Sequence, residues 1–510
     1  MVKRSQPLRP GVPATQALQE IARDALTACD ASRAVERAVW AGAGRVVIGG
    51  RTISLRRKGN LLVLAFGKAS GAMTRGLLNR IAEAGGSRAV RCLVIGSERA
   101  SRPKGRPRVL QETIRGDHPV PGRASFAAGR KALQFVSSLR PNDDLIFLAS
   151  GGGSSMMASP LTPFLSSREK TSLHRALIVS GAPIGAINAI RRTFSAVKGG
   201  RLAGVARRAR TQTTLVVCDV DPERFGEVAS GPSLPDHGGR EAAVLAIDRY
   251  GLAPLMPAAI LNVLQTDRLP AAPGPGHPAF RRAAWESILS NRELREAAIR
   301  AGRSRGLDVE SPVEGLTGPT DDAAGRLAEA IEKAPPHGRL LVLGGEVLTQ
   351  PLGDGVGGRA SELALCLAIR MSDRKSGPWA FLAFGSDGLD GNSPAAGAYA
   401  DATTLHRSVA ARLDVERALA GSDTHRFFRR IGDDFVTGPT GTNVRDLYLL
   451  LTGTQESSRS GHAGARKKQG RAGPGRRARP GRRVGSGRSV RPLTRGRRPS
   501  RRGSGSSRSR

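Results

Sequence analysis

Three loops in the first half of the chain carry residues that can bind anions or metal ions, and each loop follows an apolar run of strand length. Lys68 lies just after residues 61–66, and Asp219 directly follows residues 214–218. Between them, residues 144–149 lead into a glycine-rich loop made of Ser150, Gly151, Gly152, Gly153 and Ser154. Glycines let the backbone approach a ligand, and free backbone N–H groups bind phosphate or carboxylate. We therefore expect this loop to bind an anion, with Lys68 as a point charge for phosphate.

The second half of the chain adds an arginine and further carboxylates. Arg359 ends the glycine-rich loop 353–359 at an expected helix start, where a guanidinium can clamp a carboxylate or a phosphate. Asp387 and Asp390 lie in a loop after the apolar run 379–384. Carboxylates at strand ends suit Mg²⁺, which takes one or two of them together with phosphate oxygens, and such a group can instead orient a substrate hydroxyl. The alternative for both aspartates is turn chemistry, because Asp-Gly is a favoured turn pair.

The elements that must position these residues follow a repeated order of strand, glycine-rich loop and helix. Continuous apolar strands that alternate with helices indicate a parallel sheet covered on both faces, so the sequence predicts an α/β fold. Ligands bind such sheets at the carboxyl ends of the strands, where all of these loops are expected. A chain of 510 residues favours two domains.

Two common nucleotide-binding motifs are missing from the sequence positions at which they would indicate a nucleotide site. The chain has no GxxxxGK[ST] motif, and no GxGxxG follows its first strand. The glycine-rich loops favour a transferase that acts on anionic substrates, but they do not identify the substrate.

The net charge of +37 resembles that of a nucleic-acid-binding protein, but its distribution does not. Residues 457–510 contain 19 Lys and Arg and no Asp or Glu, and they have almost no large apolar residues. We expect 456–510 to be a disordered basic tail. Two interpretations stay open: a tail that binds nucleic acid or another polyanion, or out-of-frame translation of a GC-rich gene.

The remaining composition favours a soluble, cytoplasmic protein, and we expect a monomer or a homodimer. The four cysteines are spaced neither for zinc nor for a disulfide framework, so we expect reduced thiols. No secretory signal follows the basic residues 1–13, which we expect to be disordered, and no apolar run reaches the length of a membrane span.

A longer set of motifs resembles one known family. In chain order the motifs are Leu64-Ala-Phe-Gly-Lys-Ala69, Gly116-Asp-His-Pro-Val-Pro-Gly122, Ser150-Gly-Gly-Gly-Ser154, Ser180-Gly-Ala-Pro-Ile184, Val197-Lys-Gly-Gly-Arg-Leu-Ala203, Ala229-Ser-Gly-Pro232, Gly344-Gly-Glu346, Gly357-Gly-Arg359, Gly385-Ser-Asp-Gly388 and Gly438-Pro-Thr-Gly-Thr-Asn443. Over about residues 14–455 the chain resembles the MOFRL-type (class II) glycerate 2-kinases, some of which carry the name hydroxypyruvate reductase.

The resemblance implies a Rossmann-like N-terminal domain, a C-terminal MOFRL domain and an active site in the cleft between them. We expect the domains at 14–235 and 311–455, joined by a Pro-rich linker with connecting helices at 236–310. The implied activity is Mg²⁺-dependent (or Mn²⁺-dependent) phosphorylation of D-glycerate by ATP, most often at the 2-hydroxyl.

The resemblance also assigns site residues. Lys68, Asp219, Arg359 and Asp387 fall on catalytic positions, with the two aspartates as the candidate metal ligands. Lys198 joins the glycine-rich loop in binding phosphate, and Arg359 and Asn443 are expected to bind the substrate. The chain departs from the family pattern at Ala360, where Asn is common, and at Pro394, which replaces a carboxylate.

Two other functions remain as alternatives. One is a hydroxypyruvate reductase, which would oxidise NAD(P)H without ATP. The other is a degenerate enzyme that binds nucleic acid through its basic tail.

Overall fold

The computed structural model describes residues 14–96, 109–266, 268–335, 337–374 and 376–453. Both termini, including the predicted basic tail, lie outside the described residues. The fold is α/β with two main sheets, as the sequence predicts. No helix among the described residues is both long enough and apolar enough to cross a membrane.

The first sheet has six parallel strands in the order β6-β5-β4-β7-β8-β9. Their bounds are β4 (Leu61–Phe66), β5 (Val90–Gly96), β6 (Val109–Arg115), β7 (Asp144–Ser150), β8 (Thr211–Val217) and β9 (Ala283–Leu289). The chain runs from β4 to one side of the sheet and returns to its other side at β7. The carboxyl ends of β4 and β7 therefore form a switch point, where ligands bind in open α/β sheets.

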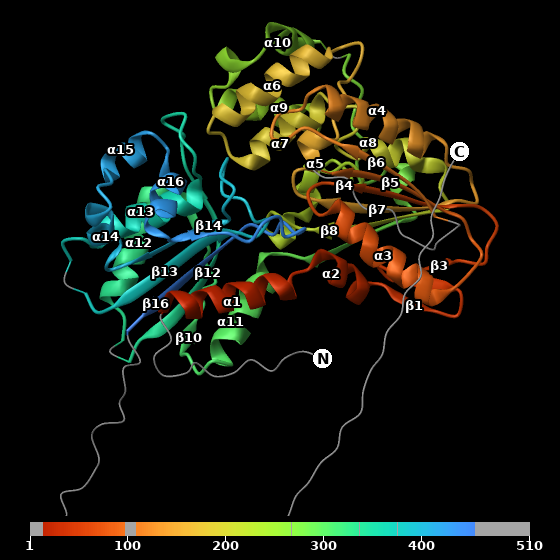
Figure 1. Ribbon diagram of the computed structural model, residues 1–510. Coiled ribbons are helices and arrows are strands. Elements are labelled where there is room, and N and C mark those ends of the chain that lie inside the picture. The colour runs from red at the N-terminus through yellow and green to blue at the C-terminus, as the bar shows by residue number, and fades with distance from the viewer. Residues whose placement is uncertain (1–13, 97–108, 267, 336, 375, 454–510) are drawn as a thin grey trace, which may run out of the picture. The chain divides into compact units, whose positions relative to one another are not determined.

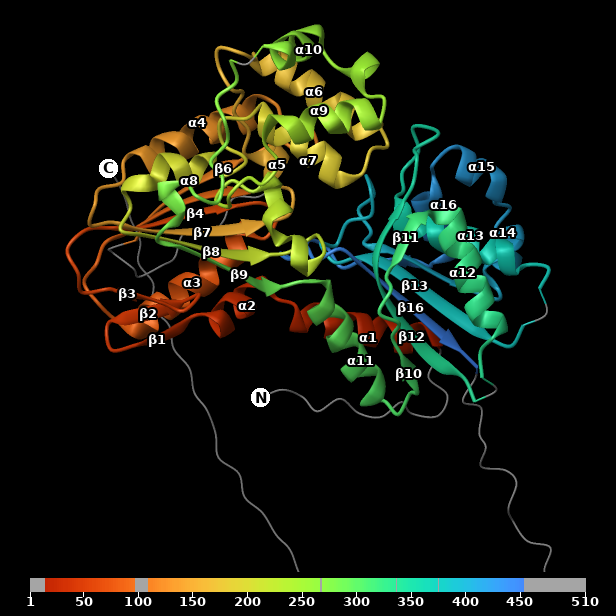
Figure 2. The same ribbon diagram turned by 180° about the vertical axis from the view of Figure 1, so that it is seen from behind.

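Helices cover both faces of this sheet, as Figures 1 and 2 show. Helices α2 (Ala31–Ala38) and α3 (Ser70–Ala84) pack on one face, and α4 (Arg123–Ser137) and α8 (Arg201–Val205) pack on the other. Asp30 caps α2 by accepting a hydrogen bond from the backbone of Arg33 at 2.8 Å. A small antiparallel sheet of β1 (Trp40–Gly42), β2 (Arg45–Ile48) and β3 (Arg51–Ser54) follows α2.

Four helices form a separate layer beside the first sheet, which we call the helical subdomain. Its members are α6 (Ser167–Val179), α7 (Ile184–Thr193), α9 (Gly239–Arg249) and α10 (Ala258–Gln265). They enclose an apolar cluster of their own, to which Leu173, Ile190 and Ile247 contribute. The single-turn helix α5 (Gly153–Met156) lies between the glycine-rich loop and this subdomain.

The second sheet is mixed, with the order β10-β12-β16-β13-β14-β15 and with β11 also paired to β12. Its strands are β10 (Val309–Glu310), β11 (Leu316–Pro319), β12 (Arg339–Leu348), β13 (Trp379–Gly385), β14 (Gly397–Asp401), β15 (Asp434–Phe435) and β16 (Asp446–Thr452). Strand β16 is antiparallel to both β12 and β13, and Asp446 pairs with Gly345 on one side and Gly385 on the other. The register thus brings the start of β16 against the last residues of β13 and a late part of β12.

Two helix layers cover the second sheet. Helices α12 (Thr320–Glu332) and α13 (Arg359–Met371) pack on one face, together with α14 (Thr404–Ala410), α15 (Val415–Ala420) and α16 (Thr424–Ile431). Helices α1 (Ala14–Ala28) and α11 (Asn291–Arg303) pack on the other.

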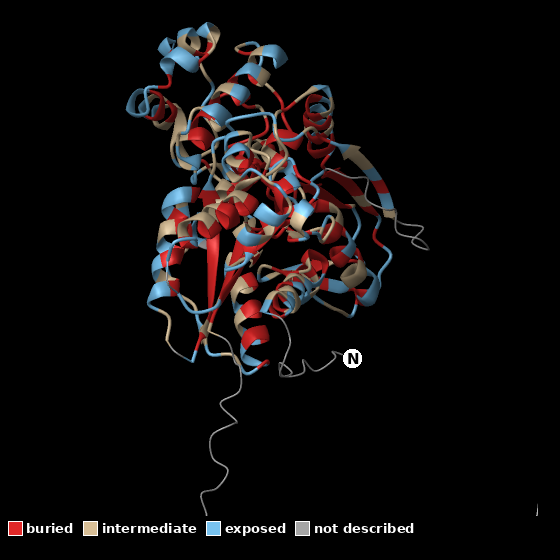
Figure 3. Ribbon diagram, turned by 60° about the vertical axis from the view of Figure 1, so that its left-hand side comes forward, coloured by how far each residue is buried: buried red, intermediate tan, exposed pale blue. Residues whose placement is uncertain are grey.

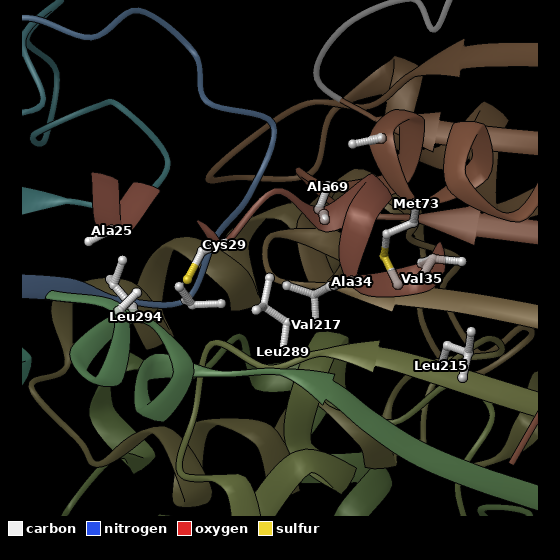
Figure 4. Close-up of a cluster of buried hydrophobic side chains, with 14 of the residues drawn as sticks. Ala25, Cys29, Ala34, Val35, Ala69, Met73, Leu215, Val217, Leu289 and Leu294 are labelled. Atoms are coloured by element: carbon white, nitrogen blue, oxygen red, sulfur yellow. The ribbon is translucent and has the colours of Figure 1, made fainter. Parts of the chain in front are cut away.

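A continuous core joins the two sheets through α1 and α11. Ala25 and Cys29 lie near Leu294 of α11, and the same cluster extends to Val217 and Leu289 of the first sheet (Figure 4). Buried residues, red in Figure 3, line the strands and the inner sides of the helices, whereas the outer helix surfaces are exposed. All four cysteines are free, as the sequence predicts.

The structure groups several segments differently from the expected domain boundaries. Helix α1 packs on the second sheet, although we expected it in the N-terminal domain. The segment 236–310, expected to be a Pro-rich linker with connecting helices, contains helices α9 and α10 but also supplies strand β9 of the first sheet. Edge strand β9 escaped prediction because its side chains are mostly only half-buried and include Glu286, so it lacks a continuous apolar run.

Candidate active site

A cleft of about 2240 Å³ lies between the carboxyl ends of the first sheet's strands and the loops at one end of the second sheet. Its walls include Lys68 and Asp219 from one side and Arg359, Asp387 and Asn443 from the other. Five of the residues predicted from sequence to act in catalysis or substrate binding therefore face one cavity.

The loops after β4 and β7 are held together by their backbones. The backbone N–H of Lys68 donates to the carbonyl of Gly151 at 2.8 Å, and the N–H of Ala69 donates to Ser150 Oγ at 3.0 Å. Gly67 has φ +106, and a Cβ added there would lie 2.3 Å from the Ser150 carbonyl oxygen, so only glycine fits. The Ser150 side chain is fully buried and is used in this link, so it does not face a ligand as we had predicted.

Lys68 and Asp387 join the two sides of the cleft. The Lys68 ammonium and the Asp387 carboxylate lie 2.5 Å apart, and both side chains are largely shielded from solvent. The other Asp387 oxygen accepts the N–H of Leu389 at 3.1 Å, which fixes the carboxylate in its turn. Two residues predicted to be catalytic, far apart in sequence, are thus an ion pair.

A second link across the cleft involves Asp219, which follows β8. Asn443 Nδ2 lies 3.5 Å from Asp219 Oδ2. A Cβ on Gly151 would lie 2.0 Å from the same carboxylate oxygen and 2.3 Å from the Asn443 amide, so this glycine makes the close approach possible. Burial, together with the nearby charge of Glu346, raises the pKa of Asp219 to about 6.

Arg359, the first residue of α13, is already engaged by two carboxylates. Its guanidinium binds Asp446 through two N–H groups at 2.6 and 3.0 Å and Glu346 at 2.5 Å. Burial would lower the pKa of Arg359, but the two carboxylates raise it above its ordinary value. Sequence reasoning gave no role to Glu346 or Asp446. The feature that could have identified these two residues is their position. Glu346 lies near the end of β12, and Asp446 is the first residue of the neighbouring strand β16.

Asp390 holds the start of α13 in place. Its carboxylate accepts the backbone N–H groups of Ala360 and Ser361, each at 2.9 Å, and the Ser361 hydroxyl at 2.6 Å. Burial raises the pKa of Asp390 to about 6, against the opposing effect of these hydrogen bonds. Asp390 is therefore a helix cap that positions Arg359. Pro394, four residues further along the chain, is exposed and is not among the residues that line the cleft.

The structure does not place Lys198 in the cleft as we had predicted. Its side chain is fully buried and donates to the carbonyls of Ser154 at 2.5 Å and Met157 at 3.3 Å. Burial and the nearby Arg191 lower the pKa of Lys198 to about 7. Lys198 therefore supports the glycine-rich loop from the interior of the protein. The helix after that loop, α5, has a single turn, so it adds little dipole charge for an anion.

The cleft offers oxygen ligands for a divalent metal ion. No group of three or more His, Cys, Asp or Glu suited to a metal occurs in the described part of the chain. The half-buried Asp219 carboxylate and Asp387 instead fit the mode in which Mg²⁺ uses one or two carboxylates and fills its other positions with water and phosphate oxygens.

Two family models match the chain. Residues 17–265 match a domain of unknown function, DUF4147, and residues 339–446 match the MOFRL family. The first match contains Lys68, the glycine-rich loop and Asp219, and the second contains Arg359, Asp387 and Asn443.

The chain is also similar to named proteins over most of its described length. It is 34% identical over 406 residues to a protein of Agrobacterium vitis that is named a hydroxypyruvate reductase, with 78% of this chain and 88% of the relative covered. It is 31% identical over 346 residues to the D-glycerate 2-kinase of Thermotoga maritima, with 67% and 80% covered. The crystal structure of a glycerate kinase from Thermotoga maritima matches with a TM-score of 0.67 at 27% identity, covering 86% of this chain and 99% of that one.

Proposed function

The chain belongs to the family of MOFRL-type glycerate kinases, and from this premise we propose that it transfers a phosphoryl group from ATP to the 2-hydroxyl of D-glycerate. The observation that carries the proposal is the pair of links across the cleft, Lys68 with Asp387 and Asp219 with Asn443. Together they bring an ammonium group and a carboxylate of raised pKa to one cavity at the ends of the strands.

Phosphoryl transfer depends mainly on positioning and on neutralising charge, which these residues are suited to supply. Lys68 and the backbone N–H groups of the glycine-rich loop would hold phosphate oxygens of ATP. Asp219 would orient the acceptor hydroxyl and accept its proton, since a base works best when its pKa is near the working pH. With Asp219 as the base, Asp387 is the carboxylate that would hold Mg²⁺ or Mn²⁺, which neutralises phosphate charge when bound.

Of the two ligands that the sequence allows Arg359, a carboxylate or a phosphoryl group, this proposal takes the second. Because three N–H groups of Arg359 already bind Asp446 and Glu346, it would act on the transferring phosphoryl group with its remaining donors rather than as a free carboxylate clamp.

The test is release of ADP by the purified full-length chain with ATP, Mg²⁺ and D-glycerate. We expect ADP to form only when both D-glycerate and a divalent metal are present. Lys68→Met should lower kcat/KM by about 100-fold, because it removes a cation that stabilises the transferring phosphate. Lys58→Met, at an exposed lysine outside the cleft, is the matched control and should keep the wild-type rate.

The two alternatives predict other outcomes. A reductase would oxidise NAD(P)H with hydroxypyruvate in the absence of ATP. A degenerate enzyme would release no ADP with D-glycerate but would bind nucleic acid in a salt-sensitive manner that is lost when the tail is removed. Either result would replace the kinase proposal.

A further inference from the structure

A second cavity, of about 180 Å³, opens beside the main cleft beneath the helical subdomain. We call it the side pocket. It shares His118, Gly152 and Asp219 with the walls of the main cleft, so the two spaces adjoin at the carboxylate of Asp219. Its far walls come from α7, which contributes Asn188 and Arg191, and from the segment that contains Ser230.

The positively charged guanidinium of Arg191 lines this pocket and has no ion-pair partner among the described residues. In that part of the chain the guanidinium also makes no hydrogen bond, and its Nε is buried without a partner. Burial lowers the pKa of Arg191 to about 10, and no carboxylate offsets that effect. Lys68 and Arg359, by contrast, are both bound by carboxylates.

Several titratable groups near Arg191 are cationic or neutral. Arg191 lies close enough to Lys170, His174 and Lys198 to lower their pKa values. His118, on the opposite wall, has its pKa lowered to about 4 by the protein packed around its ring and by Lys68, so the ring is neutral at pH 7. A buried guanidinium in such a setting is costly unless an anion binds it.

Hydroxyl groups line another part of the side pocket, beside apolar residues such as Ile178 and Ile184. Ser155 Oγ lies 2.8 Å from His118 Nδ1, Ser154 Oγ lies 3.0 Å from Ser230 Oγ, and Ser230 donates to Asn188 Oδ1 at 2.8 Å. Each hydroxyl has a single proton, so it can donate to a bound carboxylate by turning away from its present acceptor.

One carboxylate also faces the side pocket. Glu227 binds Arg224 through Oε1 at 2.7 Å, while its Oε2 is buried without a hydrogen-bond partner. A ligand with a carboxylate and a second hydroxyl, apart from the one that reacts, would offer partners to both Arg191 and Glu227.

We propose that the side pocket binds the acceptor substrate by its carboxylate, with Arg191 as the cation that recognises it and the reacting hydroxyl turned toward Asp219. The substrate class is a small hydroxy acid. This inference rests on the proposed kinase function for the direction of the hydroxyl, but carboxylate recognition by Arg191 does not depend on it.

The two cavities differ in the size of ligand that they can hold. The side pocket is smaller than the roughly 300–1,000 Å³ of a drug-sized ligand site, whereas the main cleft of about 2240 Å³ exceeds that range. The side pocket therefore suits a three-carbon acid, and a nucleotide fits only the main cleft. The two substrates would meet at Asp219, the wall that both cavities share.

Binding can be measured without turnover by titrating calorimetrically the full-length wild-type chain, Arg191→Met and Arg191→Lys with D-glycerate, glycerol or ATP. Arg191→Met should weaken D-glycerate binding about 10- to 100-fold, the value of a charge-assisted hydrogen bond, and should leave ATP binding within about twofold. Wild-type protein should prefer D-glycerate to uncharged glycerol, and Arg191→Met should lose most of that preference. Arg191→Lys should lie between the two, because it keeps the charge but not the planar fork.

Arg175→Met, on the exposed side of α6, removes a charge from the same subdomain outside the pocket and should bind D-glycerate like the wild type. Arg191→Met should unfold at the wild-type temperature or above it, since it removes an uncompensated buried charge. If Arg191→Met fails to fold, the affinity of Arg191→Lys for D-glycerate decides the question.

Unchanged D-glycerate binding in the folded variants would overturn the proposal, as would a loss confined to ATP. A wild-type chain that does not bind D-glycerate would overturn it too. If the wild type binds D-glycerate through Arg191 but releases no ADP, the kinase proposal fails and the carboxylate site stands.

Discussion

At the residue scale, the sequence predicts which residues meet better than it predicts what each side chain does. Lys68, Asp219, Arg359, Asp387 and Asn443 all reach the cleft, because each lies at or near the end of a strand or the start of a helix. Position along the chain does not reveal side-chain direction. The catalytic and binding roles of these five residues stay predictions.

The residues that were misplaced or missed show this limit. Ser150 and Lys198 belong to the same motifs as the cleft residues, but both side chains point into the protein. Glu346 lies within a strand and Arg191 within a helix, where a single charged residue has no local signature. Only the fold brings these two to the cavities.

Lys198 allows a prediction about pH. Its pKa is about 7 in the folded protein and 10.5 when unperturbed, so between these values the unfolded chain binds more protons than the folded one. The contribution of Lys198 to the free energy of unfolding therefore increases by about 1 kcal/mol per pH unit as the pH rises above 7. Lys198→Met should remove this contribution.

The measurement is thermal denaturation of both proteins between pH 7 and 9.5. The melting temperature of the wild type should increase relative to that of Lys198→Met as the pH rises. Parallel curves would mean that Lys198 keeps an ordinary pKa in the folded state.

At the element scale, the site depends on how strand ends and one helix start are fixed. The apolar runs of β4, β7 and β13 and of the second half of β8 were predictable, because strands covered on both faces are rich in apolar residues. The edge strand β6 was not, since its exposed and buried residues mix polar and apolar types. The register that sets Asp446 between β12 and β13 arises from antiparallel pairing of distant segments, which local patterns do not encode.

The cap of α13 is the element that we expect to be most sensitive to mutation. Asp390→Ala leaves the N–H groups of Ala360 and Ser361 without partners in a buried setting, and we expect a loss of about 1–3 kcal/mol in the free energy of unfolding. Because α13 begins at Arg359, kcat should fall as well. Denaturant unfolding and steady-state kinetics would test both effects.

Asp373→Ala, at an exposed aspartate just beyond α13, is the matched control and should change neither quantity. If Asp390→Ala were as stable and active as this control, Asp390 would not be holding the helix.

At the scale of the whole molecule, the two sheets share one core in addition to the separate cluster on the opposite face of each. Helix α1, near the start of the described chain, covers the second sheet together with α11, and the cluster continues into the first sheet. Sequence patterns predicted the helix but not its partner, because packing over such a distance leaves no local periodicity.

Ile21 of α1 tests this shared core. It is fully buried among the residues that join the sheets, so Ile21→Ala should cost about 2–5 kcal/mol of stability. Gln16→Ala, on the exposed side of the same helix, should cost less than about 0.5 kcal/mol. Equal melting temperatures for the two variants would show that α1 is not part of the core.

The central claim is that the chain phosphorylates D-glycerate at its 2-hydroxyl with ATP as donor, and product identification tests it most directly. D-Glycerate labelled with ¹³C at C2 would be incubated with the full-length chain, ATP and Mg²⁺, and the products followed by ¹³C and ³¹P NMR. We predict 2-phosphoglycerate, with phosphorus coupled to the labelled carbon through the ester oxygen, and ADP in equal amount. Formation of 3-phosphoglycerate alone, or of no phosphorylated acid while NAD(P)H is oxidised with hydroxypyruvate, would contradict the account.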